Sequence, residues 1–234
     1  MLLPGGAEEV LRLAALLPLS PAVTLLLAGA AARPSGALIA GARGCFVSAF
    51  DQDPPPPLPR GARSRVTTEA FDPAAPAFRA GYHHHAMLLE PFRRGGTPDE
   101  LIAAAARALR PGGQVVLLEL VARGLPAGPW EERWIAAEGR PSAPPSEGTI
   151  PAALQRAGLR VNVVEDAGLR HRQAVMQGWQ ALITALRDGH DRPDSPAAAA
   201  LVAEAEAWLL RLRLMQEGRL RLLRWHASLA GPPG

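Results

Sequence analysis

The sequence contains no lysine, and its basic side chains are all arginines. The 25 arginines are nearly balanced by 22 acidic residues, which leaves a formal net charge of +3 over 234 residues. The high isoelectric point therefore reflects the pKa of arginine rather than a concentrated basic surface. On this balance we expect no nucleic-acid binding.

Cysteine is almost as scarce, because Cys45 is the only one in the chain. A single cysteine cannot form an internal disulfide and has no partner for a cysteine-based zinc site. This usage suits a reducing compartment, and we expect a cytoplasmic protein.

Charged residues are also missing from residues 13–32, a length that raises the question of a membrane span or signal peptide. Pro18 and Pro21 interrupt this run, and the first ten residues contain two glutamates but no basic residue, the wrong charge for a signal peptide. We therefore expect no membrane segment, but a helix within residues 1–20 followed by a buried strand.

The rest of the chain alternates strand-like apolar runs with helical patterns, which predicts a single α/β domain over residues 1–234. Thr97 and Glu100 form a T-x-x-E capping box around Pro98, which predicts a helix start. This helix is expected to stop at Pro111-Gly112-Gly113, before the buried strand QVVLLELV. Two further segments, 130–157 and 170–217, have helical patterns and are expected to cover the sheet.

The segment TPDELIAAAARALRPGGQVVLLELV resembles the class I S-adenosylmethionine (SAM) dependent methyltransferases, in which a helix ending in L-x-P-G-G leads into the fifth strand. Residues 152–182 and 218–229 look like the last two strands of small-molecule members of this family. The resemblance covers nearly the whole chain. It implies a three-layer, Rossmann-like α/β fold with a seven-stranded, mostly parallel sheet, whose antiparallel last strand lies beside the fifth.

In that family the first strand ends in an acid followed by G-x-G-x-G. The acid contacts the amino-acid part of SAM, and the glycines let the backbone approach the cofactor closely. Aligned with this sequence, the acid position falls on Leu27, and the three glycine positions fall on Gly29, Ala31 and Arg33. Only Gly29 is kept, so the resemblance implies a degenerate SAM turn.

Two acids match other cofactor positions of the family. Asp51 matches the acid that hydrogen-bonds the ribose hydroxyls, and Asp72 matches the acid near the adenine amino group. Both residues are also common in turns, so a purely structural role stays open for each.

His83 and His85 share one face of the expected fourth strand, and Glu90 follows that strand. No acid or cysteine at ligand spacing joins the histidines, so we expect no metal site and regard them as candidates to line the substrate crevice or to satisfy buried hydrogen bonds. Glu90 occupies the place where amino-group methyltransferases carry a substrate-orienting motif, but the match is poor and a plain loop is the alternative.

Trp130 and Trp134 lie one helical turn apart in a segment that commonly caps the acceptor pocket in this family. They are candidates for the crevice, for the core or for a docking surface. The densest basic segment is offset by nearby glutamates and lacks interleaved aromatics, so we expect it to form a solvated face or partner surface. Its residues are Arg211, Arg213, Arg219, Arg221 and Arg224.

Two hypotheses of function follow, and neither assigns a catalytic residue. The first is a methyltransferase-like protein that binds no SAM and serves as a binding, scaffold or regulatory subunit, with a protein partner or a second copy of the chain. The second is an active SAM-dependent methyltransferase that modifies an O, N or C nucleophile of a small molecule by positioning and desolvation. The loss of the acid and two glycines favours the first.

Overall fold

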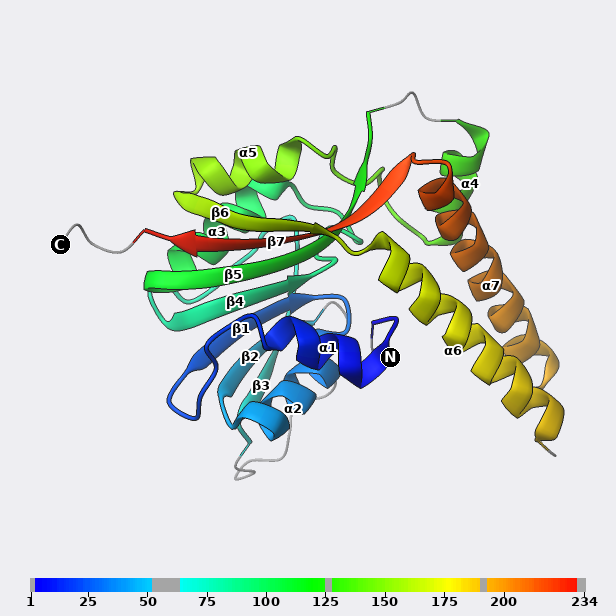
Figure 1. Ribbon diagram of the computed structural model, residues 1–234, viewed down its shortest axis with the longest axis horizontal. Coiled ribbons are helices and arrows are strands. Elements are labelled where there is room, and N and C mark those ends of the chain that lie inside the picture. The colour runs from blue at the N-terminus through cyan, green and yellow to red at the C-terminus, as the bar shows by residue number, and fades with distance from the viewer. Residues whose placement is uncertain (1–2, 52–63, 125–127, 190–192, 231–234) are drawn as a thin grey trace.

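A single sheet forms the centre of the fold. The computed structural model describes residues 3–51, 64–124, 128–189 and 193–230, and its seven-stranded sheet has the order β3-β2-β1-β4-β5-β7-β6. All neighbours pair in parallel except β7, which is antiparallel to both β5 and β6 (Figure 1). The predicted sheet is thus confirmed. The strands are β1 (Thr24–Gly29), β2 (Phe46–Asp51), β3 (Val66–Ala70), β4 (His83–Leu89), β5 (Leu109–Ala122), β6 (Leu159–Asp166) and β7 (Leu220–Leu229).

Helices cover both faces of the sheet, which gives the expected three layers (Figure 1). One apolar core lies under α1, α2 and the end of α7, and a second lies under α3 and α5. The helices are α1 (Gly6–Ala14), α2 (Ala32–Arg43), α3 (Pro98–Ala108), α4 (Pro129–Ala137), α5 (Thr149–Arg156), α6 (Gly168–Asp188) and α7 (Ser195–Gln216).

The N-cap predicted before α3 is present at Thr97. The Thr97 hydroxyl oxygen accepts the backbone N–H of Glu100 at 3.3 Å and donates to its carboxylate at 2.8 Å. Leu101, Ile102 and Ala105 are buried on the inner face of this helix. The helix ends at Ala108 and β5 begins at Leu109, so Pro111-Gly112-Gly113 lies within the strand and not at the end of the helix, which corrects the predicted boundary.

The connections leave β1 and β4 in opposite directions. The chain after β1 crosses through α2 to β2, whereas the chain after β4 crosses through α3 to β5 on the other side. Such a switch point opens a crevice outside the carboxyl ends of the two strands, where ligands bind in open α/β sheets. The candidate site is therefore expected at the ends of β1 and β4.

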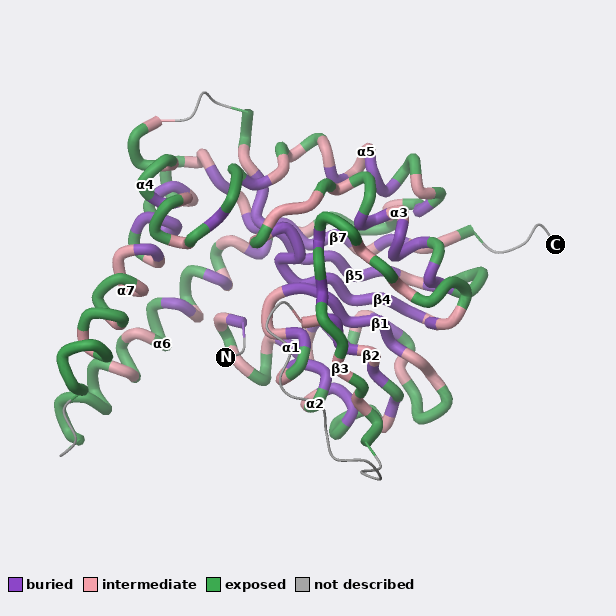
Figure 2. Tube along the Cα trace, turned by 180° about the vertical axis from the view of Figure 1, so that it is seen from behind, coloured by how far each residue is buried: buried purple, intermediate pink, exposed green. Residues whose placement is uncertain are grey.

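Helices α6 and α7 extend beyond the carboxyl edge of the sheet (Figure 1), and their outer parts are exposed (Figure 2). They form most of the predicted covering segment 170–217, although residues 190–192 lie outside the described part of the chain. The other predicted covering segment, 130–157, forms two separate helices. Helix α4 contacts α7, whereas α5 packs on α3 at the sheet. Among the described residues, no helix is both long and apolar enough to cross a membrane.

Gly29 closes β1 with a conformation that other residues rarely adopt. Its φ is +109°, and a Cβ added here would overlap the carbonyl oxygen of Leu89 at the end of β4. That same oxygen accepts the N–H of Ala30 at 2.7 Å. The close approach of β1 to β4 therefore requires glycine at this position, whether or not a cofactor binds.

Replacing Gly29 with alanine should destabilise the protein by about 3 kcal/mol or more, because backbone strain adds to a backbone overlap. Gly41→Ala is the matched control: it lies in α2, has nothing within 4 Å of an added Cβ, and should stabilise by up to about 1 kcal/mol through helix propensity. Urea unfolding of both variants measures the difference. Equal stability of Gly29→Ala and the native chain would refute the close-packing argument.

Candidate functional site

A cleft of about 590 Å³ lies at the expected switch point. The turn after β1 and the start of α2 form one wall, and α7 contributes to another. Its lining includes Gly29, Ala31, Arg33, Asp51, Glu90 and Arg211. Most of the residues predicted from the degenerate SAM turn thus meet in one place.

The start of this turn is apolar. Leu27 is completely buried and belongs to the core under α1 and α2, so no carboxylate stands at this position of β1. Ala31 adopts φ +56° at the N-cap of α2 and supplies no side-chain cap. A left-handed conformation costs an alanine about 1 kcal/mol. Both departures from the family pattern are therefore built into the backbone and the core.

Asp51 supplies the cap that Ala31 lacks. Its Oδ2 atom accepts the backbone N–H of Arg33 at 2.9 Å, in the first turn of α2. A carboxylate at a helix N-terminus satisfies an otherwise unpaired N–H and complements the helix dipole. Asp51 lines the cleft, but one of its oxygens already has this structural role, and ribose binding by it stays a prediction.

Asp72 follows β3 and does not line the cleft. Its Oδ1 atom accepts the N–H of Ala74 at 2.9 Å, the hydrogen bond of an aspartate turn. The structure thus gives Asp72 the turn role that the sequence left open.

His83 and His85 do not line the cleft, contrary to one of the two roles expected for them. His83 is the first residue of β4 and lies at the opposite edge of the sheet from the cleft, while His85 accepts the N–H of Gln114 through Nδ1 at 3.2 Å. Burial lowers the pKa of each histidine to about 4. Within the described ranges, no group of three or more histidine, cysteine or acidic side chains could hold a metal ion.

The two tryptophans of α4 are also absent from the residues lining the cleft. Trp134 is completely buried, with the Arg140 guanidinium 4.9 Å from its ring centre. Trp130 is exposed, and the Arg213 guanidinium lies 4.1 Å from its ring centre. Of the alternatives, Trp134 belongs to the core, and Trp130 lies on the surface where α4 meets α7.

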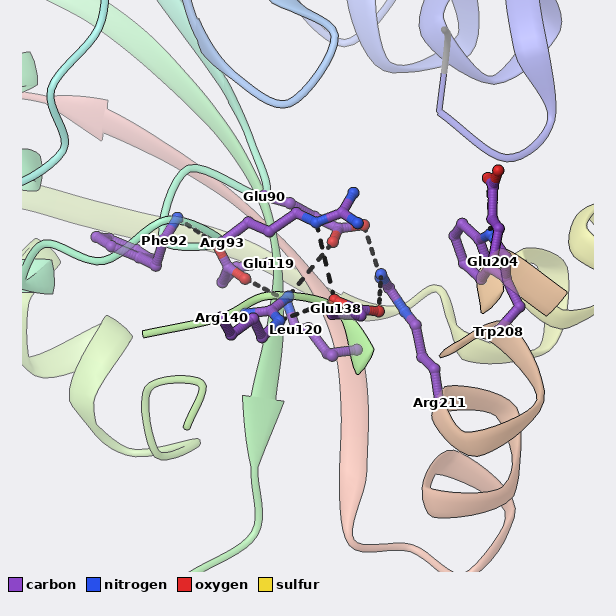
Figure 3. Close-up of polar contacts among 10 residues, drawn as sticks. All are labelled: Glu90, Phe92, Arg93, Glu119, Leu120, Glu138, Arg140, Glu204, Trp208 and Arg211. Atoms are coloured by element: carbon purple, nitrogen blue, oxygen red, sulfur yellow. Dashed lines mark hydrogen bonds and ion pairs between the residues drawn. The ribbon is translucent and has the colours of Figure 1, made fainter. Parts of the chain in front are cut away.

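A cluster of buried charges forms the inner end of the cleft. Arg211 of α7 donates to Glu90 at 2.6 Å and lies 3.5 Å from Glu138, which also accepts from Arg140 at 2.9 Å (Figure 3). Arg140 lies 3.8 Å from Glu90, and all four side chains are at most 3% exposed. Glu119 of β5 completes this buried charge cluster, and it accepts the N–H groups of Phe92 and Leu120 at 3.1 and 2.9 Å.

The surroundings set the charge of each carboxyl group in this cluster. Burial by itself would raise the pKa of Glu90, but the positive charge and hydrogen bond of Arg211 outweigh it and lower this pKa to about 2. Burial raises the pKa of Glu119 to about 8, although two backbone N–H groups favour its charged form. At pH 7 Glu90 is therefore an ionised, paired carboxylate, whereas Glu119 is mostly neutral.

Glu90 also has an unusual backbone. Its φ of +42° is one of two positive values among the non-glycine residues that the structure describes, and the other belongs to Ala31. Such conformations cost about 1–3 kcal/mol and persist where the surroundings hold them in place. Both strained residues line the cleft.

The sequence did not predict most of the buried charge cluster. Arg211 was expected on a solvated face or partner surface, but it is 1% exposed, and Arg224 is also buried, at 6%. The signal was present for Arg211, because Ala207 and Leu214, four residues before it and three after it on the same helix face, are both buried. Helical periodicity identifies such a face but does not say which other elements cover it.

Comparison with known proteins supports the fold. No family model and no curated protein sequence matches the chain. A phosphoethanolamine N-methyltransferase 2 from Haemonchus contortus is similar over 99% of the chain, at 15% identity and a TM-score of 0.78, although the match spans 54% of that protein. A geranyl diphosphate methyltransferase solved with SAM matches over 95% of this chain and 84% of its own, at 17% identity and a TM-score of 0.67.

The similar structures also include the cyclase SpnF, at 16% identity and a TM-score of 0.64, covering 96% of this chain and 81% of its own. The chain therefore has the Rossmann-like fold of class I SAM-dependent methyltransferases. At these identities the similarity establishes the fold alone.

Removing Arg211 should be strongly destabilising, because Glu90 would stay buried without its partner. We expect Arg211→Met to lower the free energy of unfolding by about 3–5 kcal/mol, and Arg211→Met with Glu90→Gln to lower it by less. Chemical denaturation of both single variants and the double variant measures the coupling. Additive losses would show that the two charges do not depend on each other.

His171 predicts a pH dependence of stability. Burial, with the nearby Arg211 charge, lowers the pKa of His171 to about 3, so below pH 6.5 the unfolded chain binds a proton that the native state excludes. Its contribution to the unfolding free energy therefore falls as the pH drops from 6.5 toward 3. His171→Phe keeps a ring against Trp208, so it should lose about 2–3 kcal/mol less between pH 7 and pH 4.5. Urea unfolding at several pH values measures this. If the unfolding free energies of the native chain and of His171→Phe changed in parallel with pH, His171 would not be the group responsible.

Proposed function

We propose that this protein does not transfer methyl groups, and that it acts in the cytoplasm as a binding, scaffold or regulatory subunit with a methyltransferase-like fold. The observation that carries the proposal is the turn after β1. Leu27 stands where the family has an acid, and its side chain is completely buried in the core. The SAM ammonium group would lack its natural partner, a loss of about 2 kcal/mol or more in a desolvated site.

Glu90 supports the same conclusion from the other side of the cleft. A general base needs a pKa near the working pH and a free lone pair directed at the substrate. Glu90 instead has a pKa near 2 and is paired with Arg211 at 2.6 Å. This carboxylate is suited to holding α7 against the end of β4 rather than to accepting a proton.

An active methyltransferase is the alternative, and one observation favours it. Gly29 and Asp51 both line a cleft of about 590 Å³, a volume within the usual range of ligand sites. The geranyl diphosphate methyltransferase of similar fold was solved with SAM. In this alternative Asp51 would bind the ribose and the cleft would hold a small-molecule acceptor.

Calorimetric titration of the full chain with SAM and S-adenosylhomocysteine separates the two functions. We expect no saturable binding below about 1 mM for either ligand, because the ammonium has no acidic partner. An active methyltransferase of the same fold, titrated under the same conditions, is the positive control. A micromolar Kd for either ligand would overturn the proposal.

The variant Ala31→Gly tests whether SAM binding is prevented by the alanine at position 31 or by the missing acid at Leu27. It removes the left-handed alanine and its methyl group but leaves Leu27 in place, so we expect slightly higher stability and still no SAM binding. If this substitution alone produced micromolar binding, the missing acid would not be the decisive loss. Co-purification from the native host tests the subunit role, and recovery of only the free chain would count against it.

A further inference from the structure

A second cavity, largely apolar, lies between the two projecting helices. It measures about 500 Å³ and is bounded by residues 3–6, α6 and α7. We call it the α6–α7 groove. Its apolar lining comprises Leu3, Val175, Trp179, Leu182, Leu201 and Trp208.

The groove adjoins the cleft. Leu3, Pro4, Glu204 and Trp208 line both cavities, and we call the two adjoining cavities the trough. Trp208 and Glu204 lie on α7 beyond Arg211, on the side away from the rest of the buried charge cluster (Figure 3). The trough is therefore polar at the sheet and apolar between the helices.

We propose that this trough binds an anionic amphiphile, with an apolar chain of about 10–14 carbons in the α6–α7 groove and a carboxylate or phosphate head in the cleft. This inference goes beyond the function proposed above and does not depend on it. None of the residues of the degenerate SAM turn lines the groove.

The groove fits a chain because its aromatic side chains face space that the protein does not fill. Trp179, Leu182, Leu201 and Trp208 are each only partly buried, although they face a common cavity. At Gly178 of α6, an added Cβ would meet nothing within 4 Å, so the wall is open there. A flexible chain would cover this apolar surface.

The cleft end complements a negative head group. Arg33, Arg93 and Arg94 line it, together with the N-terminus of α2, which has no acid in its first turn. Four acids also line this end, and each has a partner of opposite charge or an N–H donor. Glu90 and Glu138 meet Arg211, Glu138 also lies 3.8 Å from Arg93, Asp51 accepts from the first turn of α2, and Glu204 accepts the indole N–H of Trp208. An incoming carboxylate or phosphate would find the guanidinium groups of these arginines.

Tryptophan fluorescence offers a direct test, because a brominated chain quenches the indole rings that it touches. We expect 12-bromododecanoate to quench the full chain saturably. Displacement by unbrominated carboxylates should tighten about fourfold for each CH₂ from eight to twelve carbons. Dodecanoate and dodecyl phosphate distinguish the two head groups. Dodecyltrimethylammonium should bind at least tenfold more weakly than either. If this cation bound as tightly as the two anions, the assignment of an anionic head group to the cleft would be wrong.

The variant Gly178→Leu fills the groove, and Gln180→Leu is its matched control on the exposed part of the same helix. Leucine favours a helix over glycine, so both variants should stay folded, as circular dichroism can verify. We expect Gly178→Leu to weaken dodecanoate binding at least tenfold and Gln180→Leu to change it less than twofold. Unchanged binding in Gly178→Leu would overturn the proposal.

The variant Arg33→Gln examines the head separately. It keeps the backbone N–H that Asp51 accepts, and it should weaken dodecyl phosphate binding at least threefold without weakening the binding of dodecyltrimethylammonium. If Arg33→Gln bound dodecyl phosphate as tightly as the native chain, the head group would not lie in the cleft. Sedimentation of the native chain gives a last check, since a dimer that Gly178→Leu dissociates, without amphiphile binding, would assign the groove to a second copy and overturn the inference.

Discussion

The ion pair between Arg211 and Glu90 connects parts of the chain that are 121 residues apart. It fixes α7 to the end of β4, and through Glu138 and Arg140 it also fixes the segment after α4. Charges removed from water must be paired, so the loss of any one of these side chains would leave another buried charge without a partner. The position of α7, and with it one wall of the cleft and one wall of the groove, follows from this contact.

Gly29 in the SAM turn and Asp51 at the end of β2 both match cofactor positions of the family, and each has a second, structural reason to be present. Gly29 permits β1 to approach Leu89, and Asp51 caps α2 in place of Ala31. The position without such a reason, at Leu27, carries an apolar side chain that fits the core. Retention of a glycine and an aspartate is therefore weak evidence of cofactor binding here, because packing and capping alone account for both.

The centre of the sheet could be predicted from sequence because β1 is a short apolar run and because the resemblance of L-x-P-G-G places a strand at the apolar run QVVLLELV, which lies within β5. The site could be predicted only where local sequence places a side chain at the carboxyl end of a strand, as for Asp51 and Glu90. His83 begins its strand, so it lies at the other edge of the sheet. Arg140 and Arg211 come from segments outside the sheet, and their pairing depends on tertiary packing that no local pattern records.

The shared wall between cleft and groove has a thermodynamic consequence. Leu3, Pro4, Glu204 and Trp208 belong to both cavities, so a molecule that shifts them at one end changes the surface offered at the other. Two ligands that meet at such a wall are linked: if the first alters the affinity of the second by some factor, the second alters the affinity of the first by the same factor. Ligand binding between α6 and α7, which project from the sheet, would therefore depend on what is bound at the strained turn after β1.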